Sequence, residues 1–199
     1  MKRFAFFVTL ALISEAAVAA QSARSVAEDV ADVATRACYN IAIGRLRWNP
    51  ADREEEAALL KRLGLTPGIP SGIIDSFGAN TASTFNRSVL ASRANSTSHI
   101  LLAVGGAEPG CRVSVAGAPG AVTASDVTDA LRHPRNGWTF VPELTVIRGP
   151  IERRSFLRKS TDGTPLLLDV LVPTNQGGTF RLMTMISRAA PGMKLPEGW

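Results

Sequence analysis

Histidine, cysteine and aromatic residues are scarce in this chain of 199 residues, and each shortage limits the chemistry available to it. There are two histidines and two cysteines, and aromatic residues make up 6% of the sequence. Cys38 and Cys111 are far apart and have no further cysteine or histidine close by, which argues against a zinc site. A Cys-x-x-Cys redox motif is also absent. We therefore expect the protein to hold no metal and no cofactor.

Other absences concern membranes and nucleic acids. Beyond the N-terminal segment there is no apolar run of about 18 residues or more, so we expect no transmembrane span in the mature protein. The tryptophans Trp48, Trp138 and Trp199 are too widely spaced to form a stacking platform. The net charge of +5 is spread along the chain instead of forming one basic stripe. These features predict no nucleic-acid partner.

Residues 1–20 have the pattern of a secretory signal peptide. Lys2 and Arg3 precede a short apolar run over residues 4–13, and small side chains fill residues 16–20. We expect cleavage to leave a mature chain beginning at Ala20 or Gln21. No cysteine lies at the cut site to carry a lipid anchor, so the mature protein is expected to be soluble and periplasmic or secreted.

Export determines how the two cysteines are interpreted. In an oxidising compartment an isolated pair usually becomes one disulfide. A Cys38–Cys111 bridge would lower the entropy of the unfolded chain and so stabilise the folded protein by about 4 kcal/mol. Two buried free thiols and a redox pair are the alternatives, and a structural disulfide is the prediction.

The first part of the mature chain, residues 21–97, reads as helices and loops. A capping box at Ser25 and Glu28 opens a predicted helix over residues 22–41. A second helix is predicted over residues 49–64. Gly/Pro-rich and polar loops follow, with an ambiguous helix-or-strand stretch near residues 85–90.

Residues 98–188 have mainly the pattern of strands and are expected to share one domain with residues 21–97. The predicted elements are strands 98–104 and 111–116, a helix opened by Thr123 and Asp126, and strands 151–160, 165–172 and 179–188. Pro142 interrupts the apolar residues 138–147, so we do not count them as a strand, and residues 189–199 form a tail. The prediction is an α+β fold with an antiparallel sheet of about five strands and N-terminal helices packed on it. This order of elements is similar to that of profilin-like and PAS-like sensor domains.

One predicted strand is apolar on both faces. Leu166, Leu168 and Val170 alternate with Leu167 and Leu171. Such a strand is covered on both sides, either by helices on opposite faces or by a partner chain.

A catalytic centre is hard to assemble from this sequence. The candidates for a hydrolase are Ser71, His99, His133 and Asp126, which only the fold could bring together. Residues 68–72 resemble a nucleophile elbow only loosely, because Ser71 is one position late for Gly-x-Ser-x-Gly. His133 is better explained as a residue at a helix C-terminus.

Met183 and Met185 share one face of a predicted strand, with Met193 nearby. Thioether sulfur suits Cu(I), so an exported copper site is one interpretation. Methionine also fills irregular gaps in cores, and we favour core packing.

The one dense basic cluster is a candidate binding surface. It consists of Arg148, Arg153, Arg154, Arg158 and Lys159. Charges that protect an edge strand from aggregation are the simpler interpretation. Attraction of an anionic envelope partner is the functional one.

The sequence therefore predicts an exported, soluble, non-catalytic binding or accessory protein of the cell envelope, whose partner it does not identify. A hydrolase of cell-wall or exported polymers and a PAS-like ligand-sensing domain are the alternatives.

Overall fold

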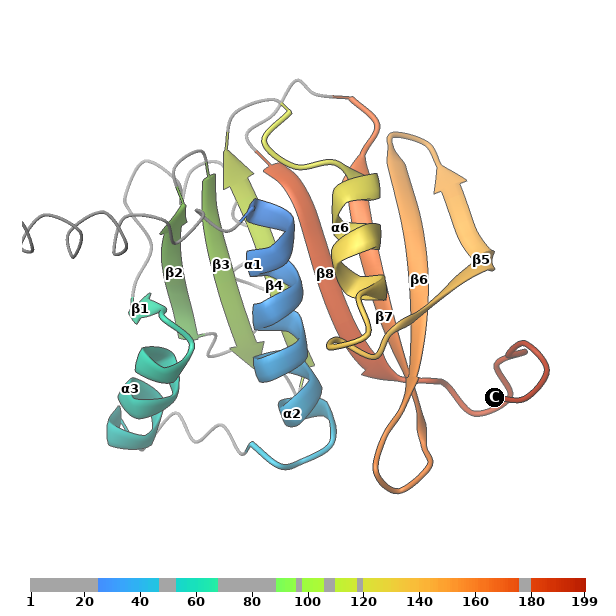
Figure 1. The fold of residues 1–199 in the computed structure, drawn as a ribbon, viewed down its shortest axis with the longest axis horizontal. Helices are drawn as coiled ribbons and strands as arrows, with labels where there is room; N and C mark the ends of the chain where they lie inside the picture. The colour runs from blue at the N-terminus through green and yellow to red at the C-terminus, as the bar shows by residue number, and fades with distance from the viewer. Residues whose placement is uncertain are drawn as a thin grey trace, which may run out of the picture.

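The computed structural model describes residues 25–46, 53–67, 89–95, 98–105, 110–117, 120–175 and 180–199. The predicted signal peptide, Ser71 and most of the loop region before residue 89 lie outside these ranges. Within them the strands form one sheet of eight, in the order β1-β2-β3-β4-β8-β7-β6-β5. Every neighbouring pair is antiparallel, and α1, α2 and α6 lie on one face of the sheet (Figure 1). The α+β prediction is confirmed.

The first predicted helix is present in three consecutive segments. These are α1 (Val26–Val33), the π-helical turn η1 (Ala34–Cys38) and α2 (Tyr39–Ala42). The first of these segments begins with the predicted capping box. Ser25 Oγ accepts a hydrogen bond from the Glu28 backbone N–H at 3.2 Å, and the Ser25 backbone N–H donates to Glu28 Oε2 at 3.0 Å. The second predicted helix is α3 (Arg53–Arg62), and its predicted first residues lie outside the described ranges.

The third helix also begins at its predicted cap. In α6 (Ala124–Arg132), Thr123 and Asp126 exchange the two bonds of a capping box, and His133 is the C-cap residue. Leu131 and Val127 are fully buried in the layer between helix and sheet. The helix packs beside α1 and over β5 and β7.

The sheet has more strands than the five or so predicted. The predicted strands are β3 (Ser98–Gly105), β4 (Gly110–Gly117), β6 (Ile151–Lys159), β7 (Pro165–Pro173) and β8 (Phe180–Arg188). The structure adds β1 (Thr66–Pro67), β2 (Val89–Asn95) and β5 (Thr139–Arg148). Pro142 does not end β5, because it lies where the β5–β6 register shifts between Val141 and Val146, and β5 ends the described strand order. Proline is tolerated at such edges and irregularities.

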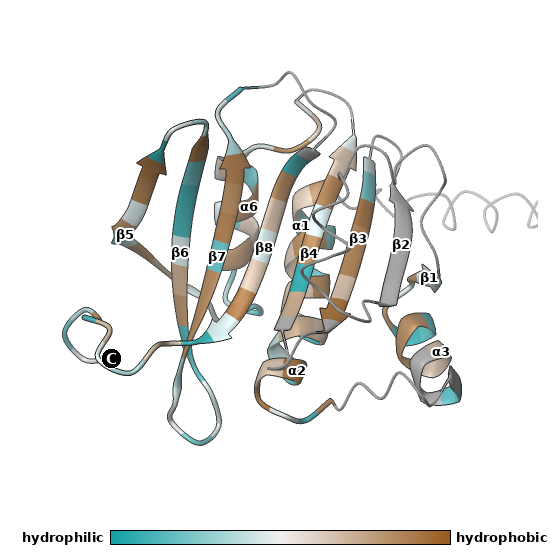
Figure 2. Ribbon diagram, turned by 180° about the vertical axis from the view of Figure 1, so that it is seen from behind, coloured by the Kyte–Doolittle hydropathy of each residue, from teal (hydrophilic) through white to brown (hydrophobic). Residues whose placement is uncertain are grey.

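Buried apolar side chains lie on both faces of the sheet, in two separate clusters. Figure 2 shows the sheet from the side opposite the helices, where β7 is coloured hydrophobic over much of its length. The helix-covered face holds the main core, which includes Phe156, Leu168 and Val170. On the opposite face Val141, Leu157 and Leu167 form a second cluster against Leu195 and Trp199 of the C-terminal tail. Leu171 lies beyond this cluster and is only partly buried. The tail thus covers one part of the second face.

The predicted disulfide joins the helical layer to the sheet. Cys38 in η1 and Cys111 in β4 are bonded, with their Cα atoms 5.1 Å apart. The two residues are only 1% and 3% exposed. Among the described helices, none has the length and apolar character needed to cross a bilayer.

Candidate functional site

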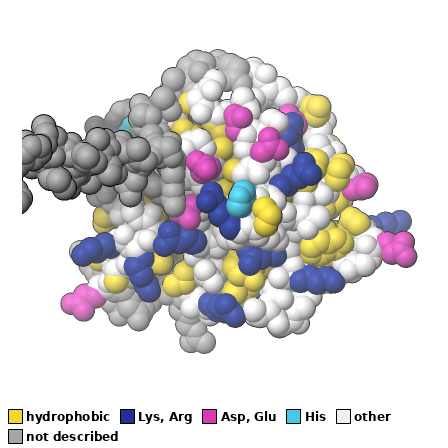
Figure 3. All heavy atoms as spheres, in the orientation of Figure 1, with side chains coloured by type: hydrophobic (Ala, Val, Ile, Leu, Met, Phe, Trp, Pro, Cys, Tyr) yellow, Lys and Arg dark blue, Asp and Glu magenta, His cyan; other side chains and the backbone are white. Residues whose placement is uncertain are grey.

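The basic cluster is divided between the two faces of the sheet. Side chains alternate along β6, and Phe156 belongs to the core beneath the helices, whereas Leu157 belongs to the cluster under the tail. Arg154 and Arg158 therefore lie on the helix-covered side, and Arg153 and Lys159 on the other. Over the helix-covered side, Lys and Arg side chains spread across the width of the molecule without forming one stripe (Figure 3).

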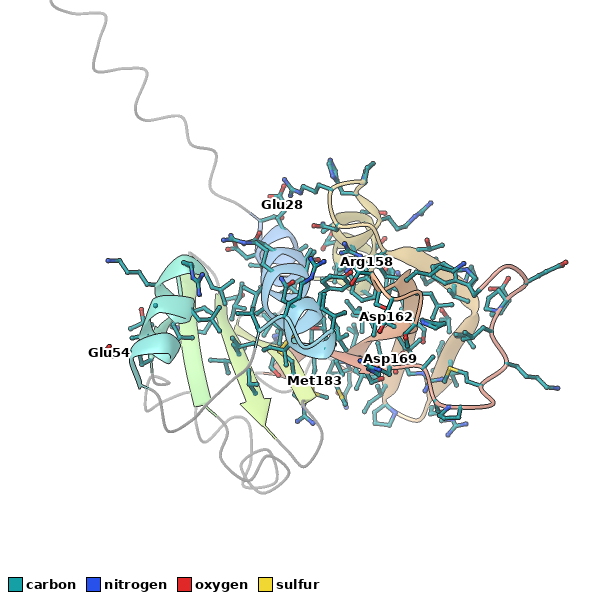
Figure 4. The ribbon with its side chains drawn as sticks, turned by 90° about the horizontal axis from the view of Figure 1, so that it is seen from below. Glu28, Glu54, Arg158, Asp162, Asp169 and Met183 are labelled. Atoms are coloured by element: carbon teal, nitrogen blue, oxygen red, sulfur yellow. A yellow bond between two sulfur atoms is a disulfide. The ribbon has the colours of Figure 1, made fainter. Side chains whose placement is uncertain are left out.

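Arg158 is bound within the protein. Its guanidinium carbon lies 3.9 Å from the ring centroid of Tyr39 and 6.0 Å from that of Trp138. Its Nη1 donates to the backbone carbonyl of Asn136 at 2.8 Å. Figure 4 shows Arg158 beside the helical layer. The residue joins β6 to α2 and to the segment before β5.

Arg154 and Lys159 also have partners inside the chain. Arg154 Nε is 2.6 Å from Glu152 Oε1, and its Nη1 donates to Thr128 Oγ1 on α6 at 3.0 Å. Lys159 Nζ donates to the Gly198 carbonyl at 2.9 Å and lies 5.6 Å from the Trp199 ring centroid. Three members of the predicted cluster thus hold the fold together.

The remaining two arginines have no ion-pair partner among the residues that the structure describes. Arg148 is exposed at the end of β5. Arg153 is half-buried, and its Nε is buried without a hydrogen-bond acceptor among the residues that the structure describes. The Nε itself is shielded from solvent, so it is the partly exposed remainder of the Arg153 side chain that a partner could reach.

Arg153 borders a partly exposed region of the face opposite the helices, which we call the open-face patch. Cross-strand pairing connects Arg153 with Leu171 and Leu171 with Met183, and in the next row it connects Asp169 with Met185. Asp169 Oδ1 accepts a hydrogen bond from Ser155 Oγ at 2.6 Å. Figure 4 shows Asp169 and Met183 on the side of the sheet away from Arg158. The patch consists of Arg148, Ile151, Arg153, Asp169, Leu171, Met183 and Met185.

The two methionines do not fill the core as we favoured from the sequence. Met185 is 37% exposed, Met183 is half-buried, and neither belongs to a core cluster. The reason is the alternation of β8, which turns both thioethers to the face that the helices leave uncovered. Among the described residues no three His, Cys, Asp or Glu side chains are grouped as a metal site needs.

The described candidates for a hydrolase are not brought together. Asp126 caps α6, where its Oδ2 accepts from the Thr123 N–H at 2.9 Å and from Thr123 Oγ1 at 2.7 Å. His133 ends the same helix, roughly 10 Å further along its axis at 1.5 Å per residue. His99 alternates with Ile100 of the main core, so it faces the other side of the sheet. Ser71 lies outside the described residues.

Two ionisable groups are perturbed in ways that belong to the fold. A hydrogen bond from Ser160 and another from the Thr164 backbone N–H lower the pKa of Asp162 to about 2 in the β6–β7 turn. Burial lowers the pKa of the Arg112 guanidinium, which lies across from Met185.

Sequence reasoning named Arg148 and Arg153 only as two members of the five-residue basic cluster, and it missed the patch beside them. The available signal was the double-sided apolar pattern of Leu171 and its neighbours, which indicated a second cover. No sequence pattern indicated that Arg154 would bind Thr128 or that Arg158 would contact Tyr39, because both contacts involve helices that are distant in sequence. Comparisons of the chain with family models, curated proteins and solved structures found no match.

Proposed function

We propose that this chain is an exported, non-catalytic binding protein of the cell envelope, active in the periplasm or outside the cell. The leader pattern of residues 1–20 supports export. The buried Cys38–Cys111 bridge supports it independently, because structural disulfides form and persist in oxidising compartments.

The open-face patch is the proposed contact surface. The observation that carries this proposal is a row of partly exposed side chains, in which Arg153 lies beside Leu171 and Met183 on the face that the helices leave uncovered. A partner that brings an anionic oxygen and an apolar surface would pair with the positive charge of Arg153 and cover Leu171 and Met183. Charge-assisted hydrogen bonds of arginine are stronger than neutral ones and favour carboxylate or phosphate.

Binding is favoured over hydrolysis because Asp126 and the two histidines, the candidate catalytic residues that the structure describes, are not grouped together. Asp126 and His133 lie at opposite ends of α6, and proton transfer requires hydrogen-bond reach or one bridging water. Binding on the surface is also favoured over a PAS-like internal pocket. Fully buried apolar side chains such as Val30, Leu131 and Phe156 pack together between the helices and the sheet, which supports surface binding.

The test is cosedimentation of the mature chain, residues 21–199, with the envelope fraction of the producing cells. We expect saturable binding that Arg153→Gln weakens about tenfold, as the loss of a charge-assisted hydrogen bond implies. Arg45→Gln is the matched control, because it removes an equal charge from an exposed position after α2. Absence of binding, or equal weakening by both variants, would contradict the proposal.

A further inference from the structure

The turn between β5 and β6 exposes two large apolar side chains. Ile147 is 68% and Ile151 is 41% exposed, and among the described residues only Met185 and Met193 are comparably exposed large hydrophobic side chains. The turn lies at an outer corner of the sheet (Figure 1). We call residues 147–151 the β5–β6 tip.

The fold holds the tip in one shape. Gly149 has a φ of 55°, a left-handed conformation that glycine adopts at low cost. The Pro150 carbonyl accepts a hydrogen bond from the Thr174 N–H at 2.7 Å, which fixes the turn to the end of β7. The isoleucines are therefore presented outward by an ordered turn, so little conformational entropy is lost on docking.

The tip is also positively charged. Arg148 is exposed within it, and Arg153 follows on the same hairpin. Glu152, the acidic residue nearest in sequence, is paired with Arg154 at 2.6 Å. Within the described ranges neither Arg148 nor Arg153 forms an ion pair. Apolar side chains next to such cations are the combination that binds at the surface of an anionic bilayer.

The two isoleucines point to opposite faces of the hairpin. Ile147 pairs across the strands with Glu152, whereas Ile151 pairs with Arg148, so they occupy alternate positions of the pleat. A protein surface meets one face of such a tip, whereas a lipid headgroup layer surrounds both. This geometry favours lipid over an acidic protein as the partner.

We propose that the β5–β6 tip docks the protein on an anionic lipid surface. Ile147 and Ile151 enter the headgroup layer, and Arg148 and Arg153 contact lipid phosphates. The inference rests on the proposed binding function and names the chemistry of its partner.

The experiment is flotation of the mature chain with vesicles of phosphatidylglycerol and phosphatidylcholine, compared with phosphatidylcholine alone. We expect binding to the anionic vesicles only, weakened by added salt. Removal of one surface charge by Arg148→Gln should weaken binding about fivefold, and Arg45→Gln less than about twofold. The exposed pair Ile147→Ser and Ile151→Ser together should weaken it by about tenfold or more.

Several outcomes would overturn the inference. Equal binding by the double serine variant would show attraction by charge alone, and equal effects of Arg148→Gln and Arg45→Gln would show no role for the tip. If the chain binds the envelope fraction even after its lipids are extracted, and does not bind vesicles, the partner is a protein or polymer and not a lipid. In that last case the proposed binding function would stand, whereas loss of both kinds of binding would contradict both proposals.

Discussion

Arg158 on β6 and Tyr39 on α2 are in direct contact, with the guanidinium carbon 3.9 Å from the ring centroid. The two residues are distant in sequence, and their contact joins the helical layer to the half of the sheet that carries the open-face patch. A residue that resembles a surface charge in the sequence is therefore partly buried and bound within the protein.

Arg158→Met should destabilise the protein by about 1–3 kcal/mol, because it removes a cation–π contact and a charged hydrogen bond to the Asn136 carbonyl. Arg148→Gln should change the free energy of unfolding by less than about 0.5 kcal/mol, because Arg148 is exposed. Urea unfolding monitored by circular dichroism measures both. Similar stabilities of the two variants would refute the internal role of Arg158.

Reduction of the Cys38–Cys111 bridge should lower the free energy of unfolding by about 4 kcal/mol, as expected for a loop of this length. The measurement is urea unfolding of the mature chain with and without reductant. The Cys38→Ala and Cys111→Ala double variant is the control, since reductant should not change its midpoint. An unchanged midpoint for the wild-type chain would rule out a stabilising bridge.

The turn between β6 and β7 should make stability depend on acidic pH. The folded-state pKa of Asp162 is about 2, below its usual 3.8, so the unfolded chain takes up the proton first as the pH falls. The stabilisation from this carboxylate is thus fully present above about pH 4 and disappears toward pH 2. Urea unfolding across this range should show a smaller loss for Asp162→Asn than for the wild type.

The Asp162 hydrogen bonds offer a second check by NMR titration. Ser160→Ala removes the largest cause of the shift and should raise the pKa of Asp162 toward its usual value. Thr161→Ala, at an exposed position of the same turn, should leave it unchanged. Equal pKa values in all three chains would contradict the assignment.

The capping box of α6 predicts a cost for Thr123→Ala of about 1 kcal/mol, since the variant leaves the Asp126 N–H without its side-chain acceptor. Thermal unfolding of the variant measures this cost. Thr161→Ala again serves as the control, because Thr161 caps no helix. A cost no larger than that of the control would show that the cap contributes nothing.

The sequence predicted the features that depend on neighbouring residues. The caps at Ser25 and Thr123 and the strand on each side of the β6–β7 turn could be found because local hydrogen bonds and side-chain periodicity define them. Strand β5 could not, since Pro142 is tolerated only through a register shift against β6. Such a shift depends on how two strands pair, and the residues of one strand do not reveal it.

The candidate site was only partly predictable for the same reason. Side-chain alternation along a strand is a local rule, and it places Arg153 on the opposite face of β6 from Arg154 and Arg158. Arg154 donates a hydrogen bond to Thr128, and Lys159 donates one to the Gly198 carbonyl. Both acceptors belong to segments that are distant in sequence and pack on opposite sides of the sheet. Arg148 and Arg153 could therefore not be distinguished from the three basic residues with internal partners before the fold was known.

The most direct test of a binding role for the open-face patch is a methionine oxidation footprint. Met185 lies in the patch and Met193 lies in the tail, and both are 37% exposed, so each is the control for the other. Dilute peroxide and mass spectrometry should show both oxidised in the free mature chain. With the envelope fraction bound, Met185 should be protected while Met193 is still oxidised. Equal oxidation of the two in the bound protein would contradict the account.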